Sequence, residues 1–165
     1  MSLNVEITVE AGDWSAFGDL EELEDLTTRA VEAAAESSEV NLLPGAEVSV
    51  LFTDDAHGRA LNAAWRSIDK ATNVLSFPSG MRVEDAALLG DIVITSETVT
   101  AEAEDQRKKP ADHLAHLIVH GFLHLVGFDH EIDAEAQVME DLERTILARL
   151  GIADPYRDAL CREFE

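Results

Sequence analysis

Histidines cluster in one short stretch of this sequence. Five of the six fall between positions 113 and 130. Two of these, His120 and His124, are one helical turn apart, so their rings would share one face of a helix. Zinc binds imidazole nitrogens at about 2.0–2.1 Å, which places neighbouring ligand atoms about 3.4 Å apart. Two histidines at this spacing can meet that requirement, and the pair therefore indicates a metal site.

A third ligand has to come from elsewhere in the chain. His116 shares the same face, but it is eight residues from His124, or about 12 Å along a helix axis, and cannot bind the same ion. Gly127 offers another route, because glycine adopts the left-handed conformation that ends a helix and turns the chain back. Three residues later, His130 can return to the metal. We therefore predict His120, His124 and His130 as the metal ligands.

This ligand set also indicates the kind of metal site. Neutral imidazoles suit zinc, and three protein ligands leave one coordination position open, which is typical of a catalytic ion. We expect one zinc ion per chain. His113 and His116 remain as residues that hold a ligand in place, face the substrate or support the fold. Of the two, His116 is the one that we expect to contact substrate.

The spacing of the three histidines is that of the metzincin zinc proteases, but their catalytic glutamate is missing. Gly121 stands in its place. Cleavage of a peptide bond needs a base and an acid for the leaving amine, and that glutamate supplies both. Ordinary proteolysis is therefore disfavoured. A phosphodiester instead develops negative charge that a metal and an arginine can neutralise.

Charge is distributed unevenly along the chain. The whole sequence has a formal net charge of −22, yet residues 56–82 contain four bases and a single acid. The overall acidity argues against wrapping nucleic acid with the whole surface, although it leaves room for a local basic groove. The basic segment is either a chance feature of a loop-rich stretch or a patch that binds an anion.

Hydrophobic periodicity predicts the elements that must position these residues. Helical patterns cover five segments, residues 19–38, about 54–65, 96–109, 110–126 and 133–150. Alternating or β-branched runs predict four strands, at residues 3–9, 48–52, 73–77 and 91–95, whereas residues 80–88 are expected to form a loop. We predict a single α/β (α+β) domain over residues 1–165, in which about five helices pack on a mixed sheet and a zincin-like helix carries the histidines.

Composition excludes several classes of protein. Hydrophobic residues make up 46% and charged residues 28% of the chain, which is typical of a globular domain. No run of 18 apolar residues is present, so we expect no membrane span. The single cysteine, Cys161, fits a reducing compartment, and we expect no disulfide-linked partner. The first 20 residues carry four acids and no base, which is unlike a secretory signal.

Residues 120–130 resemble the signature H-G-x-L-H-L-x-G-[YF]-D-H of the YbeY family of bacterial rRNA maturation factors. The resemblance extends over about residues 45–157. Further family motifs are matched at residues 61–66, 71–78, 90–94, 139–151 and 154–156. One departure is Asn73, which stands where the family usually has an aspartate and so lacks its charge.

The resemblance implies a cytoplasmic, zinc-dependent endoribonuclease that is specific for single strands. It implies a role in maturing the 3′ end of 16S rRNA and in ribosome quality control, with the ribosome or its assembly factors as partners. Two alternatives remain open. One is a non-catalytic ribosome-assembly factor that the metal only stabilises, and the other is a metal-dependent hydrolase of another substrate.

The resemblance also implies an arginine near the substrate phosphate, here Arg66. We expect it to be the catalytic residue, because a guanidinium can contact phosphate through two donors. The alternative is an ion pair with Asp69 or Asp91. The other bases of residues 56–82 are expected either to contact the RNA backbone or to be solvated, namely Arg59, Lys70 and Arg82.

We expect specific roles for three further side chains near these motifs. Asp129 is expected to support a ligand histidine through a hydrogen bond, with a plain turn residue as the alternative. Trp65 and Phe77 could stack on nucleobases, but packing in the core is the expectation for both.

Overall fold

Four strands form one sheet whose register is set by three ladders. The computed structural model describes residues 3–70 and 72–156. Cys161 therefore lies outside the described residues. The strands are β1 (Leu3–Val9), β2 (Ala46–Thr53), β3 (Val74–Pro78) and β4 (Leu88–Thr95). They lie in the order β1-β2-β4-β3, with β1, β2 and β4 parallel and β3 antiparallel to β4. The predicted four-stranded mixed sheet is confirmed.

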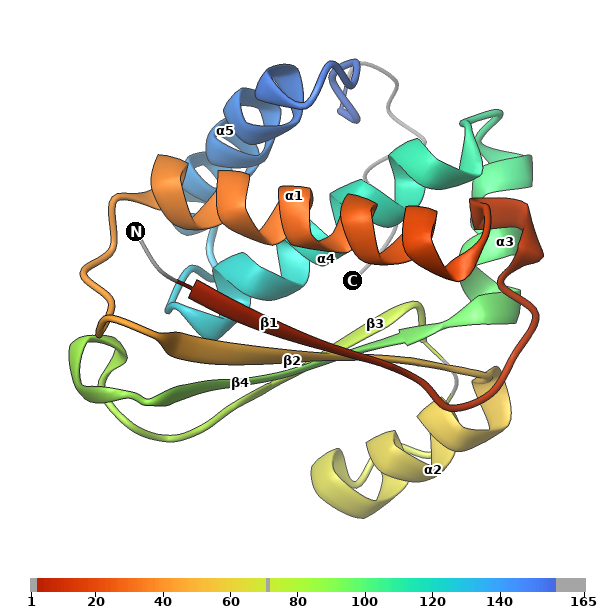
Figure 1. The fold of residues 1–165 in the computed structure, drawn as a ribbon, viewed down its shortest axis with the longest axis horizontal. Coiled ribbons are helices and arrows are strands. Elements are labelled where there is room, and N and C mark those ends of the chain that lie inside the picture. Colours follow the sequence, from red (N-terminus) through yellow and green to blue (C-terminus); the bar gives the residue numbers. More distant parts are fainter. Residues whose placement is uncertain (1–2, 71, 157–165) are drawn as a thin grey trace.

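Five α-helices surround this sheet in the described part of the chain. They are α1 (Leu20–Ser38), α2 (Asp55–Arg66), α3 (Ser96–Asp105), α4 (Pro110–Leu125) and α5 (Asp133–Arg149). Figure 1 shows α1, α4 and α5 on one side of the sheet and α2 on the other. The predicted single α/β domain with five helices is therefore confirmed.

Helix α4 lies at the centre of the layer above the sheet. It packs against β3, β4, α1, α3 and α5, and its residues from His113 to Leu123 are all buried. A helix surrounded in this way needs an apolar surface all round, and the polar side chains of its buried stretch are histidines that find partners inside the protein. Pro110 begins the helix at a position where a missing N–H costs nothing.

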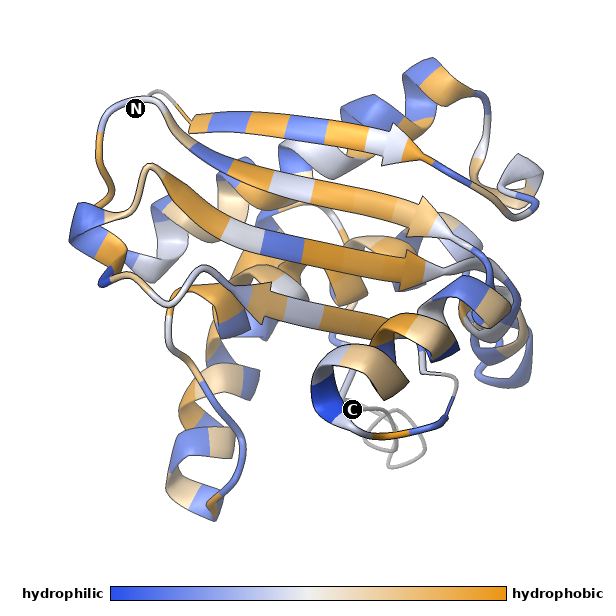
Figure 2. Cartoon of the chain, turned by 90° about the horizontal axis from the view of Figure 1, so that it is seen from below, coloured by the Kyte–Doolittle hydropathy of each residue, from blue (hydrophilic) through white to orange (hydrophobic). Residues whose placement is uncertain are grey.

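Strand sequences reflect which faces are covered. Along the edge strand β1, half-buried apolar residues alternate with exposed polar ones, whereas Ile92–Thr95 of β4 are buried in succession. Figure 2 shows this difference as alternating colours on β1 and a continuous hydrophobic run on β4. Strands covered on both faces read as continuous apolar runs, and here α4 and α2 both contact β4.

The structure departs from the sequence prediction mainly at element ends. Both β2 and β4 begin before their predicted starts, because their first residues pair with each other across a bulge at Glu47 and Val48. Two short 3-10 helices, Ser15–Phe17 and Val83–Asp85, were not predicted, and the second interrupts the expected loop. Among the described helices, none has the length and hydrophobicity that crossing a bilayer requires.

Candidate metal centre

The last turn of α4 and the loop after it bring three histidines together. His120 and His124 lie one turn apart on α4, and the helix then ends in a Schellman motif. In this motif the N–H of Phe128 donates to the carbonyl of Leu123 (2.9 Å) and the N–H of Gly127 to that of His124 (3.2 Å). Gly127 has φ +104°, a backbone conformation that is unfavourable for any residue with a Cβ atom. This turn sends the chain back towards α4.

The three imidazoles face one another at ligand spacing. One ligand nitrogen from each of His120, His124 and His130 lies within 4.8 Å of the other two. The Nε2 atoms of His120 and His124 are 3.1 Å apart, close to the separation of about 3.4 Å that two ligands of one zinc ion have. The His130 ring lies 4.9 Å from the His124 ring, centre to centre. The geometry and donor atoms therefore fit a metal ion.

The electrostatics of His124 favour a neutral imidazole. Burial, followed by the proximity of His120 and His130, lowers the pKa of His124 to about 4. A ligand histidine must offer a lone pair, so a ring that resists protonation near neutral pH suits metal binding. His120 is buried and His130 is exposed, so the site opens to solvent on the side of the loop.

A buried carboxylate that the sequence analysis did not identify supports the trio from behind. Glu143 of α5 is fully buried, and its Oε2 accepts from His120 Nδ1 at 2.9 Å. Because the carboxylate only accepts, this bond places the His120 proton on Nδ1 and leaves the Nε2 lone pair facing the trio. The other oxygen, Oε1, accepts from His116 Nε2 at 2.7 Å and from the Tyr156 hydroxyl.

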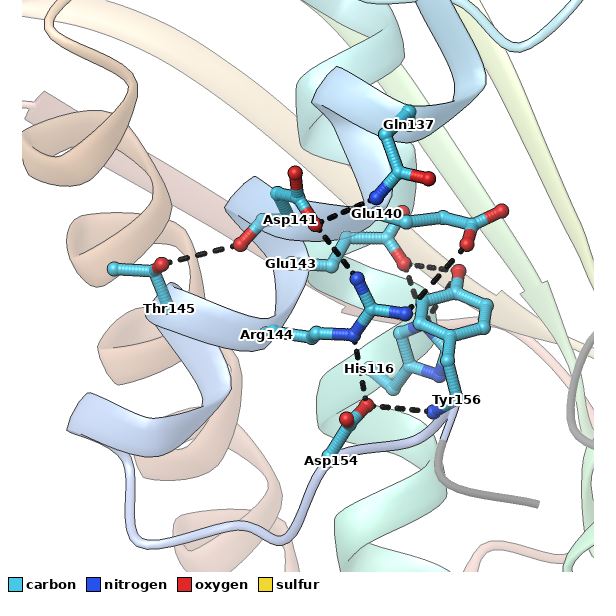
Figure 3. A network of polar contacts seen from close by, with 9 residues as sticks. All are labelled: His116, Gln137, Glu140, Asp141, Glu143, Arg144, Thr145, Asp154 and Tyr156. Carbon is cyan, nitrogen blue, oxygen red and sulfur yellow. Dashed lines mark hydrogen bonds and ion pairs between the residues drawn. The ribbon is translucent and has the colours of Figure 1, made fainter. Parts of the chain in front are cut away.

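Figure 3 shows how this carboxylate is enclosed, with Glu143, His116 and the Tyr156 ring converging between α4 and α5. Burial alone would raise the pKa of the Glu143 carboxyl, but the hydrogen bonds from His116 and His120 outweigh it and hold the pKa well below its usual range. Burial and the neighbouring Glu143 charge raise the pKa of the Tyr156 hydroxyl. Both groups therefore keep the protonation states that their hydrogen bond requires.

One sequence signal could have revealed Glu143. It occupies the apolar stripe of α5, between Met139 and Ile146, and both of these flanking residues are buried. An acid on the core-facing side of an amphipathic helix needs a partner, since a buried unpaired carboxylate is costly. The histidine-rich helix was the obvious source of that partner.

Beside the histidines lies an open cavity of about 680 Å³. Its walls come from the C-terminal part of α2 and the loop after it, from alternate residues of β3, and from residues 120–131. Arg66 lines it, and its Nη2 donates to the carbonyl of Ser76 on the edge strand at 2.9 Å. The guanidinium also lies over the Phe77 ring, 5.6 Å from its centre. These contacts hold Arg66 in the wall that the histidines share.

The other sequence-predicted residues take different places. Lys70 lines the same cavity, whereas Arg59 and Arg82 do not and instead pair with Asp69 and Glu84. Since Asp69 is held by Arg59, the alternative pairing of Asp69 with Arg66 is not seen.

The two remaining candidates have inward or main-chain partners. The His116 ring is buried against Glu143 and is not part of the lining of this cavity. Asp129 lines the cavity and accepts from the main-chain N–H of His130 at 2.7 Å. This bond shapes the backbone that carries His130.

Two departures from known motifs have local explanations. Gly121 faces the sheet, where an added Cβ would lie 3.0 Å from Ile92 Cγ2, and its carbonyl accepts from the Ser76 hydroxyl. A glutamate at this position would clash with the sheet.

Asn73 donates from its amide to the Glu102 carboxylate at 3.0 Å. An ionised aspartate there would instead face a second carboxylate, which explains why asparagine suits this chain.

The two aromatic residues near the motifs differ in their surroundings. Phe77 is half-buried beneath Arg66. Trp65, in contrast, is 74% exposed, so the prediction that it packs in the core is wrong. The buried residues of α2 are Gly58 and Asn62, and Gly58 faces Thr95 at the end of β4. Trp65 lies one turn beyond Asn62, in the last turn of the helix, where its ring is left in solvent.

These features define an α/β protein whose central helix and following turn gather three histidines, fit for a metal ion, beside an open cavity with an arginine in its wall. Comparisons with known proteins agree with this description. The family model described as endoribonuclease YbeY matches residues 8–151. The chain therefore belongs to the YbeY family.

Relatives with the same name match nearly the whole chain. The protein named endoribonuclease YbeY of Rhodopseudomonas palustris strain BisB18 is 51% identical over 158 residues, which cover 93% of this chain and 92% of the relative. The endoribonuclease YbeY of Rhizobium meliloti is 50% identical, and the match covers 95% of this chain and 96% of the relative. A solution structure of a Thermotoga maritima protein shares the fold, with a TM-score of 0.56 at 22% identity, over 93% of this chain and 99% of that one.

Proposed function

We propose that this chain is a zinc-dependent endoribonuclease that cleaves single-stranded RNA in the cavity between its three histidines and Arg66. The observation that carries the proposal is that one open cavity is lined by all three imidazoles and by a fixed guanidinium. The endoribonuclease name of the family model and of the relatives supports RNA as the substrate.

The residues of the cavity divide the work between metal binding and substrate binding. His120, His124 and His130 would hold one zinc ion, which when bound supplies Lewis acidity next to the scissile phosphate. Arg66 binds the non-bridging oxygens of that phosphate and neutralises the charge that builds on them in the transition state. Lys70, further along the same wall, binds a neighbouring backbone phosphate. Glu143 keeps the His120 ring in the orientation and tautomer that a ligand needs.

Specific features of the site argue against peptide hydrolysis. The position that carries the general base in metzincins is packed against the sheet here, at Gly121. Arg66 and Lys70 line the cavity from α2 and the loop after it, whereas its acids, Asp129 and Glu131, come from the loop after α4. The cationic side of the cavity can bind the phosphates of a polyanion. By the same family resemblance we extend the proposal to the 3′ end of 16S rRNA as the substrate, to the ribosome or its assembly factors as partners, and to the cytoplasm as the location.

An RNA cleavage assay tests the proposal. The wild-type protein is compared as purified, after chelation and after restoring zinc, on one sequence as a single strand and as a duplex. We expect cleavage of the single strand alone, loss of cleavage on chelation and its return with zinc. His124→Ala should lose both stoichiometric zinc and activity, whereas His57→Ala, on the exposed part of α2, should keep both. Zinc binding without cleavage would indicate an assembly factor and contradict the proposal.

A further inference from the structure

Helix α2 ends in an apolar surface that the fold leaves uncovered. Trp65 is 74% exposed, and Ile68 just beyond the helix is 49% exposed. The other tryptophan, Trp14, is 7% exposed and packs edge-on against Phe52. A large aromatic ring is costly to leave in water, so an exposed tryptophan indicates a binding surface more often than an exposed aliphatic residue does.

This surface is continuous with the candidate active cavity. Three residues near Trp65 in the sequence line the cavity, namely Asn62, Arg66 and Ile68. Asn62 lies one helical turn before Trp65, and Arg66 follows it directly, so the helix carries Trp65 at the edge of the segment that forms this wall. Figure 1 shows α2 on the opposite side of the sheet from α1, α4 and α5.

The charge around the rim selects one kind of occupant. Arg66 and Lys70 line the cavity next to it, while the nearest acid in the sequence, Asp69, is paired with Arg59. The whole chain has a formal net charge of −22, so most of its surface repels a polyanion. The cations beside this rim are therefore where a polyanion can bind. An apolar ring beside cations matches a nucleic acid strand, which presents a flat base next to each phosphate.

We propose that Trp65, flanked by Ile68, is a stacking platform for one unpaired nucleobase of the strand whose phosphodiester lies in the cavity. This inference rests on the proposed function and deepens it. A base inside a duplex has both faces covered by its neighbours, so only a single strand can present a free face to the indole. The platform therefore contributes to the selection of single-stranded RNA.

Tryptophan fluorescence tests this stack directly, because the chain has two tryptophans and Trp14 is buried. Stopped-flow mixing of the zinc-loaded protein with RNA measures binding before cleavage proceeds. We expect a single strand to quench the emission of the protein. A duplex of the same sequence, and a strand with the same phosphates but an abasic site at each position, should give little quenching. In Trp65→Phe the quenching by the single strand should disappear.

Affinity measurements separate stacking from phosphate binding. Trp65→Ala should bind the single strand on the order of tenfold to a hundredfold more weakly, while Trp65→Phe, which keeps an aromatic face, should retain most of the affinity. Both variants should bind the abasic strand as the wild type does. Leu20→Ala, which trims a 58% exposed side chain on α1, serves as the matched control and should bind as the wild type does. Thermal unfolding should be unchanged in all three.

The outcomes distinguish the platform from the function on which it rests. If Trp65→Ala binds and cleaves single-stranded RNA as the wild type does, the platform is overturned while the endoribonuclease stands, and the rim is then a surface for a protein partner. Equal quenching by the abasic strand would also overturn it. If no form of RNA binds the wild-type protein, the proposed function fails first.

Discussion

At the scale of single residues, Glu143 joins parts of the protein that the sequence keeps far apart. Its two oxygens accept hydrogen bonds from His120 and His116, and one of them also accepts a hydrogen bond from the Tyr156 hydroxyl. The carboxylate thereby sets which nitrogen of His120 points at the other ligands. Orientation of a ligand histidine by a carboxylate raises its basicity and fixes its tautomer, so the effect of this residue should be seen in metal affinity.

Glu143→Gln should therefore weaken zinc binding by about 10- to 100-fold. The amide keeps the shape of the side chain, but it lacks the charge and can present an acceptor to only one of the two histidines. Competition with a zinc-binding dye measures the change. Glu135→Gln, on the exposed first turn of the same helix, is the control and should bind zinc as the wild type does. Wild-type zinc affinity in Glu143→Gln would show that the carboxylate only supports the fold.

At the scale of elements, the end of α4 decides whether three ligands can meet. The helix supplies His120 and His124 from one face, and the Schellman turn at Gly127 returns the chain so that His130 reaches them. A continuation of the helix beyond this point would carry His130 away along the axis. The turn is therefore as much a part of the site as the ligands are.

Gly127→Ala tests this turn. An alanine at φ +104° is expected to cost about 1–2 kcal/mol of stability and to displace His130, so zinc binding should weaken as well. Gly80→Ala is a matched control, because Gly80 has φ +89° and likewise no atom within 4 Å of an added Cβ, yet it lies outside the cavity. Denaturant unfolding of the metal-free proteins and zinc titration give the two quantities. A loss of stability without a loss of zinc affinity in Gly127→Ala would show that the turn does not position the ligand.

Much of this arrangement could be predicted from the sequence because it is local. Helix α4 follows from its periodicity, from Pro110 at its start and from Gly127 after its end. Other parts depend on contacts between distant segments. The partner of His120 comes from α5, and the early starts of β2 and β4 come from their pairing with each other. The exposure of Trp65 likewise depends on how far along α2 the contact with the rest of the fold extends, since Gly58 and Asn62 are buried and Trp65, one turn later, is not.

At the scale of the whole molecule, the histidine site joins α4, the loop after it and α5. His120 and His124 belong to α4, His130 to the loop before α5, and Glu143 to α5 itself. A metal held by this set is bound by the native state and far less by the unfolded chain. Its binding free energy therefore adds to the free energy of unfolding.

Removal of the metal should lower the melting temperature. At a free zinc concentration of 100 times Kd, the stabilisation is about 2.7 kcal/mol, which for a chain of this size corresponds to about 5–10 °C. Differential scanning calorimetry with and without chelator measures the shift, and His124→Ala, which lacks a ligand, should show none. An equal melting temperature for zinc-loaded and chelated wild type would mean that the trio does not hold a metal in the folded protein.

The central claim is that RNA is cleaved between the histidine trio and Arg66, and single-turnover cleavage by Arg66 variants tests it most directly. Loss of the guanidinium removes charge stabilisation that exists mainly in the transition state, so Arg66→Ala should slow cleavage about 10²–10³-fold. Zinc content and melting temperature should stay as in the wild type. Arg66→Lys should recover part of the rate, since it keeps the charge but loses the two-pronged contact. Arg29→Ala, on the exposed side of α1, should cleave normally. Cleavage by Arg66→Ala at the wild-type rate would contradict the account.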